Sequence, residues 1–381
     1  MIFSNFVANS LVDHTQVTTV YFDFKNAFDK VNHAILIMKM LVNFDIPPYL
    51  VLILLSYLSS RKQFVMFNNC ASEPYPVSSG IPQGSNLGPI LFCLFINDLP
   101  DCLQNCNVLL YAYDLKLYQT VVSTDDCNKI QLDIDNIVVW SLFNKMPLNQ
   151  EKCEVMNFST NKIIHLNLLL NGHPLSAATL VKDLGLYFDA GLTFKNNIQQ
   201  MLSSATKSLS FVIRICHNFS KISTFKLLYN AFVRSKLDYG SVVWNKQFSS
   251  WSNDVEKVQK RFLRYLYYRS HKVYPNYKNG IIPTTSLQKE FSIISLKDRR
   301  VRNDILFLFK LLQNKIDCPQ ILNSINFRVN AKSTRQKNVF AVLNSQVLKA
   351  PILRILSLSE LFDIDFNHDS INNILKKITP P

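Results

Sequence analysis

Residues 78–92 read SSGIPQGSNLGPILF, and three glycines and two prolines fall within ten positions of this stretch. Glycine permits backbone conformations with positive φ and close approach to a ligand, whereas proline fixes φ. A loop of this composition is expected to hold one shape. Ser85 is placed to cap a helix that we expect to begin near Asn86, with Pro89 in its first turn. Because helix N-termini bind anions, the loop predicts a phosphate site.

Acidic segments flank this loop on both sides. Before it, an apolar strand-like run delivers Asp23, and after it residues 107–119, NVLLYAYDLKLYQ, are typical of a β-hairpin whose turn falls at Tyr113 and Asp114. Two strand-borne carboxylates with a phosphate-type loop between them predict paired ligands for a hard cation such as Mg²⁺. Two such ions can stabilise both oxygens of an in-line phosphoryl transfer.

Three segments carry a specific resemblance when taken in order: FDFKNAFDKVNH (22–33), GIPQGSNLGPILFCLFINDLP (80–100) and YAYDLKLY (111–118). They resemble the reverse transcriptase of non-LTR, LINE-type retrotransposons, and are most similar to that of Jockey-like elements. The resemblance extends over roughly residues 18–320. It includes residues 140–158, a region similar to the primer grip at 183–194, and residues 227–245, 255–266 and 295–312.

The resemblance implies a role for each matching position in the metal site. Asp23 matches the first metal-binding aspartate, and Asp114 matches the second aspartate of the family's Ala-Asp-Asp hairpin. Here the hairpin reads Ala112-Tyr113-Asp114, so the intervening aspartate is replaced. The implied cofactor is a pair of Mg²⁺ ions, with Mn²⁺ as an alternative.

The remaining matches concern the nucleotide. Phe28 matches the aromatic residue that excludes a ribose 2′-hydroxyl, and Gln83 with Gly84 matches the loop that contacts the incoming nucleotide. Lys152 matches a lysine that protonates the pyrophosphate leaving group. The implied partners are an RNA template, a DNA primer and deoxynucleoside triphosphates.

Tyr113 predicts an impaired catalytic site. A phenol is uncharged near neutral pH and is a poor ligand for Mg²⁺. Losing one charged ligand from a site that works by electrostatic stabilisation should raise the transition-state free energy by several kcal/mol, which is roughly 10³-fold in rate. We therefore expect an RNA-directed DNA polymerase with reduced activity. The alternative is a catalytically dead retrotransposon remnant that at most binds RNA or DNA.

Charge is distributed unevenly along the 381 residues, which carry a net charge of +14. Residues 1–200 hold 12 Lys and Arg against 16 Asp and Glu, whereas residues 201–381 hold 29 against 11. The basic half is expected to bind nucleic acid. Within residues 257–269, basic and aromatic residues interleave, which suits phosphates and stacked bases; the alternative is an amphipathic helix whose aromatic residues belong to the core. The candidate contacts are Lys257, Lys260, Arg261 and Arg264.

The predicted fold class is α+β: a polymerase right-hand palm, with an antiparallel sheet backed by helices, followed by helical regions. Residues 1–190 would form the palm with a remnant of the fingers, 191–272 a helical thumb-like region, and 286–381 a basic C-terminal helical region, with a linker near residues 274–285. Only 22 residues, none of them Lys or Arg, precede Asp23, so we expect truncated fingers.

Residues 161–190 are expected to form a β-hairpin with an Asn171-Gly172 turn, followed by a strand that ends at Asp189.

Three further expectations concern single segments. Residues 125–140 should form a helix whose Asp126, Asp133 and Asp135 lie on a solvated face. Residues 295–312 should form a helix with a basic first half, a candidate for RNA contact despite the unfavourable helix dipole. From Asn323 onward we expect incomplete order.

The cysteines and apolar stretches argue against other classes. The eight cysteines lack paired CxxC spacing and an accompanying histidine cluster, which disfavours a zinc site and indicates reduced thiols without a disulfide-linked partner. The longest clean apolar run, residues 49–58, is too short to span a membrane and is expected to be a core helix. Without a targeting signal, the sequence predicts an intracellular protein, and the resemblance implies work in the nucleus.

Overall fold

The computed structural model describes residues 1–161, 163–245, 251–275, 282–328, 339–341, 350–366 and 368–378. The chain divides into two compact units. One unit is His14–Leu180, and the other combines Met1–Asp13 with Val181–Pro381. The predicted end of the palm at residue 190 lies ten residues beyond this division.

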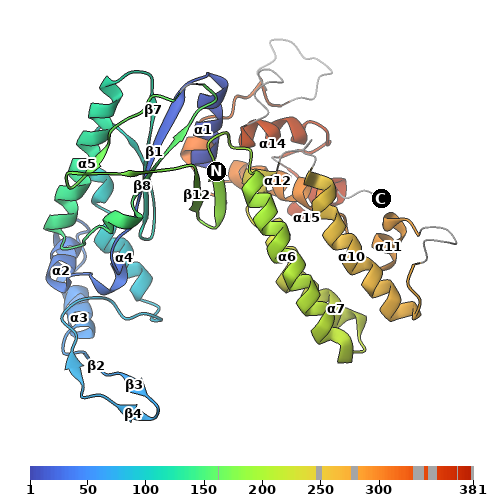
Figure 1. The fold of residues 1–381 in the computed structure, drawn as a ribbon, viewed down its shortest axis with the longest axis horizontal. Coiled ribbons are helices and arrows are strands. Elements are labelled where there is room, and N and C mark those ends of the chain that lie inside the picture. Colours follow the sequence, from blue (N-terminus) through green and yellow to red (C-terminus); the bar gives the residue numbers. More distant parts are fainter. Residues whose placement is uncertain are drawn as a thin grey trace. The chain divides into compact units, whose positions relative to one another are not determined.

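A five-stranded sheet organises the His14–Leu180 unit, in the order β11-β8-β1-β7-β6 (Figure 1). The central strand β1 is rich in β-branched and aromatic residues, which favour β-strands, and it is buried along most of its length. It pairs antiparallel with β7 and β8, whereas β11 joins β8 in parallel, so the predicted antiparallel sheet carries one parallel edge strand. The strands are β1 (Gln16–Phe22), β6 (Asn107–Tyr111), β7 (Asp114–Val121), β8 (Glu154–Phe158) and β11 (Ser176–Ala178).

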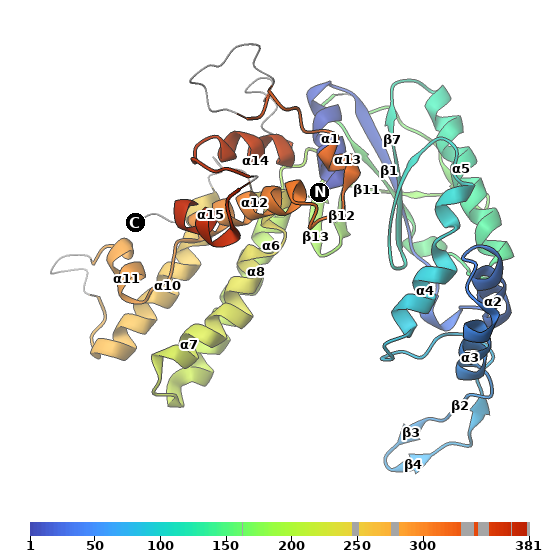
Figure 2. The ribbon, with the colours of Figure 1, turned by 180° about the vertical axis from the view of Figure 1, so that it is seen from behind.

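Helices α2 (His33–Val42), α4 (Gly88–Ile96) and α5 (Asp125–Phe143) cover one side of this sheet (Figure 2). Their buried side chains form one core with alternate residues of β1 and β7. The short 3₁₀ helices η1 (Ala27–Asp29), η2 (Leu99–Cys102) and η3 (Gln150–Lys152) connect these elements. Core members include Val20, Phe22, Phe92, Phe95, Leu115, Leu117, Ile134 and Ile137.

The acidic residues of α5 correct one expectation. Asp126 and Asp133 are buried rather than solvated, and Asp135 is exposed. The Asp133 carboxylate accepts backbone N–H groups of residues 104, 105 and 106 at 3.0, 2.9 and 2.7 Å, and so holds the segment that leads into β6. A buried carboxylate is tolerated because these donors replace its water.

The helix α3 (Pro48–Leu58) differs from the expectation that residues 49–58 form a core helix. It forms as predicted, but only Val51 and Leu58 are buried, and Leu52 and Ile53 are more than 60% exposed. It is therefore not a core helix. A thin arm of short strands follows it (Figure 2), made of β2 (Lys62–Gln63), β3 (Met66–Phe67), β4 (Cys70–Ala71) and β5 (Tyr75–Pro76).

Two small hairpins follow the sheet. Strands β9 (Leu169–Leu170) and β10 (His173–Pro174) are joined by Asn171 and Gly172, both with positive φ, as an Asn-Gly hairpin turn requires. Strands β12 (Leu180–Asp183) and β13 (Leu186–Asp189) form the second pair. Both the Asn-Gly turn and the strand ending at Asp189 are as predicted.

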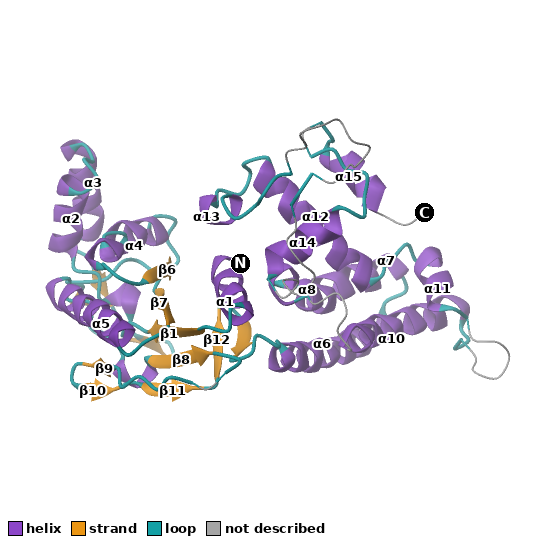
Figure 3. Ribbon diagram, turned by 90° about the horizontal axis from the view of Figure 1, so that it is seen from above, coloured by secondary structure: helices purple, strands orange, loops and turns teal. Residues whose placement is uncertain are grey.

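The second unit is helical, as predicted for residues beyond 191. In this helical unit (Figure 3), the long helices α6 (Lys195–Ile215) and α10 (Trp251–His271) run side by side (Figure 1). Tyr229, the last residue of α7 (Ile222–Tyr229), stacks on Phe262 of α10 with ring centroids 3.9 Å apart. No described helix is long and apolar enough to cross a membrane.

The other helical segments of this unit are α1 (Ile2–Val12), η4 (Cys216–Asn218), α7 (Ile222–Tyr229), the π-helical η5 (Asn230–Arg234), α8 (Ser235–Asp238), α9 (Ser241–Trp244), α11 (Thr284–Glu290), α12 (Leu296–Leu312), α13 (Pro319–Leu322), α14 (Pro351–Ser359) and α15 (Ile371–Ile378).

Two of the four basic residues in the first half of α12 are engaged inside their own unit. Arg299 forms an ion pair with Asp238 at 2.7 Å, and Arg300 is buried with Nη2 donating to Ser252 Oγ at 3.1 Å. These two side chains are therefore structural, which corrects their expected exposure to RNA. Half of the predicted linker, residues 276–281, lies outside the described residues.

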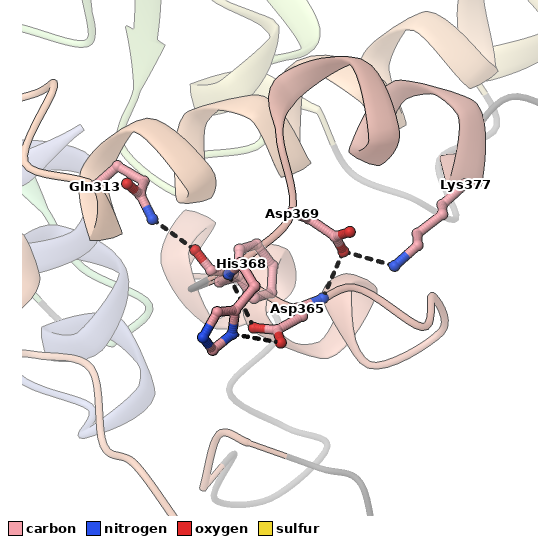
Figure 4. Close-up of polar contacts among 6 residues, drawn as sticks. Gln313, Asp365, His368, Asp369 and Lys377 are labelled. Carbon is pink, nitrogen blue, oxygen red and sulfur yellow. Dashed lines mark hydrogen bonds and ion pairs between the residues drawn. The ribbon is translucent and has the colours of Figure 1, made fainter.

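The part of the C-terminal segment that the structure describes includes the helices α14 and α15. Residues 329–338, 342–349, 367 and 379–381 lie outside the described residues, so incomplete order from Asn323 onward stays a prediction. Figure 4 shows the turn before α15, where Asp369 accepts from Lys377 Nζ at 2.6 Å and from the backbone N–H of Asp365 at 2.8 Å. The Lys377 hydrogen bond holds the pKa of Asp369 below its usual range. Gln313 of α12 donates to the carbonyl of Phe366 at 2.7 Å (Figure 4), so this turn is fixed to the helical unit.

A buried ion pair joins α12 to α14. Arg354 Nη1 lies 2.6 Å from Asp304 Oδ2, the two side chains are 5% and 0% exposed, and Asn245 donates to the same carboxylate at 3.2 Å. Burial raises the pKa of Asp304 to about 6 and lowers that of Arg354. Both pKa shifts arise because burial removes water from the two ions. Removing either partner would therefore leave the other charge buried and unpaired.

Replacing Arg354 by methionine should therefore leave the Asp304 carboxylate buried without its cation. We expect the free energy of unfolding to fall by about 3–5 kcal/mol, measured by urea denaturation followed by circular dichroism. The double variant Arg354→Met, Asp304→Leu is the control, and should recover much of this loss. A single variant as stable as the unmodified protein would contradict the assignment.

Candidate active site

The pairing of β1 with β7 brings two acidic residues to one end of the sheet. The last registered pair is Phe22 with Leu115. Asp23 follows the first and Asp114 precedes the second, so one further step of the register sets the two carboxylates opposite each other. Residues opposite each other in an antiparallel pair project to the same face. Because Phe22 and Leu115 face the core, Asp23 and Asp114 belong to the other face of the sheet.

Polar partners from the segment before β8 hold Asp23. Asn149 Nδ2 donates to Asp23 Oδ2 at 3.2 Å, and the Asn149 backbone N–H donates to the Asp23 carbonyl at 2.7 Å. Lys152 Nζ lies 3.8 Å from the same carboxylate oxygen. The sequence singled out Lys152 but missed Asn149, because an asparagine before a short helical turn is common and carries no distinctive signal.

The Gly-rich loop is bonded to the segment that follows Asp23. Gly80 N–H donates to the Val31 carbonyl at 2.8 Å, and Ile81 N–H donates to the Phe28 carbonyl at 2.9 Å. Gly80 has φ of 86°, and a Cβ there would lie 2.9 Å from the backbone of Asp29. Only glycine allows the backbone at position 80 to lie this close to the backbone of Asp29. The Gly-rich loop and the segment that carries Phe28 therefore form one rigid piece.

The helix after the loop begins at Gly88, two residues later than predicted. Ser85 Oγ accepts the Gly88 N–H at 2.9 Å and donates to the Pro82 carbonyl at 2.9 Å. The predicted cap residue thus satisfies a backbone group at the start of α4, with Pro89 in the first turn as expected.

An aromatic contact links Phe28, a candidate nucleotide-binding residue, to the hairpin of β6 and β7. The ring of Phe28 stacks on Phe92 with centroids 4.6 Å apart, and the ring of Tyr113 meets Phe28 edge to face at 6.1 Å. Gln83 Nε2 donates to Asp29 Oδ1 at 3.0 Å, an interaction that the sequence did not suggest. Gly84 has φ of 81° and open space where a Cβ would stand.

The oxygen donors at this site suit a hard cation, but there are few of them. Asp23 and Asp114 offer carboxylate oxygens on one face, whereas Tyr113 packs its ring against Phe28. Among the described residues, no group of three or more His, Cys, Asp or Glu side chains could hold a metal ion. Two carboxylates thus fit as Mg²⁺ ligands, with one fewer than the sequence resemblance implies.

The four basic candidates of α10 lie together in the helical unit. They line a cavity of about 580 Å³ with Ile213, Tyr265, Tyr274 and Pro275. Phe262 and Tyr265 are buried, so for these two aromatic residues the core alternative holds. The four are Lys257, Lys260, Arg261 and Arg264.

Comparison with known proteins places these observations in a family. The family model described as reverse transcriptase (RNA-dependent DNA polymerase) matches residues 6–209. The RNA-directed DNA polymerase from mobile element jockey of Drosophila melanogaster is 27% identical over 274 residues, covering 68% of this chain and 29% of the relative. The probable RNA-directed DNA polymerase from transposon X-element, also of Drosophila melanogaster, is 24% identical over 253 residues, covering 65% and 28%. The chain thus spans less than a third of the length of these relatives.

Among solved structures, the apo telomerase of Candida tropicalis is similar to this chain. The TM-score is 0.42 at 12% sequence identity, and the match covers 78% of this chain and 49% of the telomerase chain.

Two alanine substitutions test the rigidity of the Gly-rich loop. Gly80→Ala and Gly84→Ala both place a side chain at positive φ, which destabilises by about 1–2 kcal/mol. At Gly80 the added methyl group also meets the Asp29 backbone, so we expect a further loss of about 1–3 kcal/mol for Gly80→Ala alone. Urea denaturation of the two variants measures the difference. Equal losses would show that the loop does not depend on this contact.

Proposed function

Because the chain belongs to the reverse transcriptase (RNA-dependent DNA polymerase) family, we propose that it supports RNA-templated DNA synthesis, joining a deoxynucleotide to the 3′-hydroxyl of a DNA primer. The fold predicted from the sequence, an α+β palm followed by helical regions, is confirmed. The observation that carries the proposal is the β1–β7 register, which brings Asp23 and Asp114 to one end of the sheet.

Asp23 and Asp114 are the proposed metal ligands, for two Mg²⁺ ions or alternatively Mn²⁺. When bound, such ions stabilise negative charge on the attacking and leaving oxygens. The protein contributes the orientation of the carboxylates. Asn149 fixes one oxygen of Asp23, and Lys152 neutralises part of its charge.

The incoming deoxynucleoside triphosphate is proposed to bind between the Gly-rich loop and Phe28. Phe28 would exclude a ribose 2′-hydroxyl, and its stack on Phe92 keeps the ring from moving aside. Gln83 would contact the nucleotide, with Asp29 orienting its amide, and the open space at Gly84 allows close approach of the backbone. These contacts support a preformed nucleotide site.

Lys152 is proposed to donate a proton to the pyrophosphate leaving group. Its side chain is 68% exposed and lies 3.8 Å from Asp23 Oδ2, a loose ion pair that leaves the ammonium able to turn toward a bound phosphate. General acids of this kind contribute typically about 10²–10⁴-fold to a rate.

Tyr113 favours a second reading for this chain, a catalytically dead remnant that binds RNA or DNA through its basic half. The substitution removes a charged oxygen from the metal site, and a phenol in contact with Phe28 does not replace it. An RNA template and a DNA primer meet inside cells, so intracellular action, with the nucleus as the proposed compartment, belongs to the same proposal.

Primer extension on an RNA template with Mg²⁺ and deoxynucleotides distinguishes the two readings. We expect weak extension by the unmodified chain and an increase of about 10³-fold in Tyr113→Asp, because a third carboxylate returns to the site. Asp23→Ala should abolish extension in both backgrounds.

The control is Tyr113→Phe, which keeps the aromatic contact with Phe28 and should extend like the unmodified chain. Equal rates for the unmodified chain and Tyr113→Asp would show that two carboxylates suffice. No extension by any variant, with binding of the primer–template retained, would favour the dead remnant.

A further inference from the structure

The basic residues of α10 form one face of that helix. Lys257, Lys260, Arg261 and Arg264 follow the spacing of three, four and seven residues that aligns side chains on a helix. All four line the same cavity, and Lys257 also pairs with Asp254 at 2.7 Å. Four basic side chains therefore line this cavity.

The neighbouring arginine does not belong to this face. Arg269 donates to the backbone carbonyls of His217 and Phe219, and its guanidinium lies 5.0 Å from the centre of the Phe225 ring. It anchors the turn after α6 to α10. Of the basic residues in this stretch, Arg269 is therefore structural, whereas the other four line the cavity.

Aromatic and apolar side chains complete the cavity. Tyr274 is 58% exposed, lines the cavity, and is stacked on Tyr268 with ring centroids 4.3 Å apart and an interplanar angle of 13°. Because this stack holds the Tyr274 ring in a fixed orientation, little freedom is lost when another flat group packs on it. Ile213 and Pro275 add apolar surface.

We propose that this cavity, lined by the basic face of α10 and by Tyr274, binds single-stranded nucleic acid, with phosphates on the basic residues and one unpaired base stacked on Tyr274. A base in a duplex hides its faces in the stack, so only an unpaired base can use the ring. The cavity volume of about 580 Å³ is ample for one nucleotide. This inference rests on the proposed nucleic-acid contact of α10 and adds the strand state that the contact selects.

Fluorescence anisotropy with labelled oligonucleotides tests it on the full chain. The probes are a 16-nucleotide single strand, as DNA and as RNA, and the blunt DNA duplex of the same sequence. The unmodified chain should bind the single strands several-fold more tightly than the duplex. A preference for DNA or for RNA would identify which strand occupies the site.

Tyr274→Ala should weaken single-strand binding by about tenfold and leave duplex binding unchanged, whereas Tyr274→Phe should bind like the unmodified chain. Tyr49→Ala, at a tyrosine of α3 that is 65% exposed, is the matched control and should have no effect. Circular dichroism verifies that each variant is folded.

The double variant Lys260→Gln, Arg261→Gln should weaken binding to both probes and reduce the salt dependence of single-strand binding by about 1.4 in the log–log slope. Lys310→Gln, at an exposed lysine of α12, serves as the charge control. Duplex binding at least as tight as single-strand binding, an unaffected Tyr274→Ala, or equal displacement by polyglutamate would overturn the proposal. Asp23→Ala should bind the single strand normally, so loss of polymerase activity and loss of this site are separable.

Discussion

The antiparallel pairing of β1 with β7 is the constraint on which the candidate active site depends. Its register places the core side chains of both strands on one face and sets Asp23 and Asp114 on the other. A slip of one residue would exchange the two faces and turn the carboxylates toward the core. The cost of removing Val20, Phe22, Leu115 and Leu117 from that core therefore fixes the position of the carboxylates.

The second neighbour of β1 supplies the rest of the site. Strand β8 pairs with β1 so that Glu154 lies opposite Tyr21, and this register leaves residues 149–153 beside Asp23. Asn149 and Lys152 reach its carboxylate from that segment. The central strand thus positions the acid and both of its polar partners through backbone hydrogen bonds.

Tyr113 separates stability of the fold from chemistry of the site. It lies in the turn between β6 and β7, is 41% exposed, and gains an aromatic contact with Phe28. Replacing a carboxylate here leaves no buried polar group unsatisfied, and edge-to-face aromatic pairs are stabilising. A protein with this substitution can retain its structure fully while its metal site loses charge, so an intact palm is not in itself a sign of activity.

Local sequence signals predicted local structure well. The Asn171-Gly172 turn, the helix starting at Asp125 and the stiff Gly-rich loop each follow from the conformational preferences of a few adjacent residues. Partners distant in the sequence could not be read in this way. Asn149 lies 126 residues from Asp23, and Asp133 binds backbone groups about 28 residues away. The exposure of α3 was missed for the same reason, since its apolar residues reveal a preference for burial but not what covers them.

The two basic helices of the C-terminal unit show why net charge alone does not identify a binding surface. Both α10 and α12 carry clustered Lys and Arg, and from composition both are candidates for nucleic-acid contact. In α12, Asp238 and Ser252 engage Arg299 and Arg300 inside the unit, so these two side chains are held within the fold. In α10, the corresponding residues border a cavity that also contains an exposed aromatic ring. A positive helix becomes a recognition surface where several of its charged side chains line one cavity and where the neighbouring surface offers a second kind of contact.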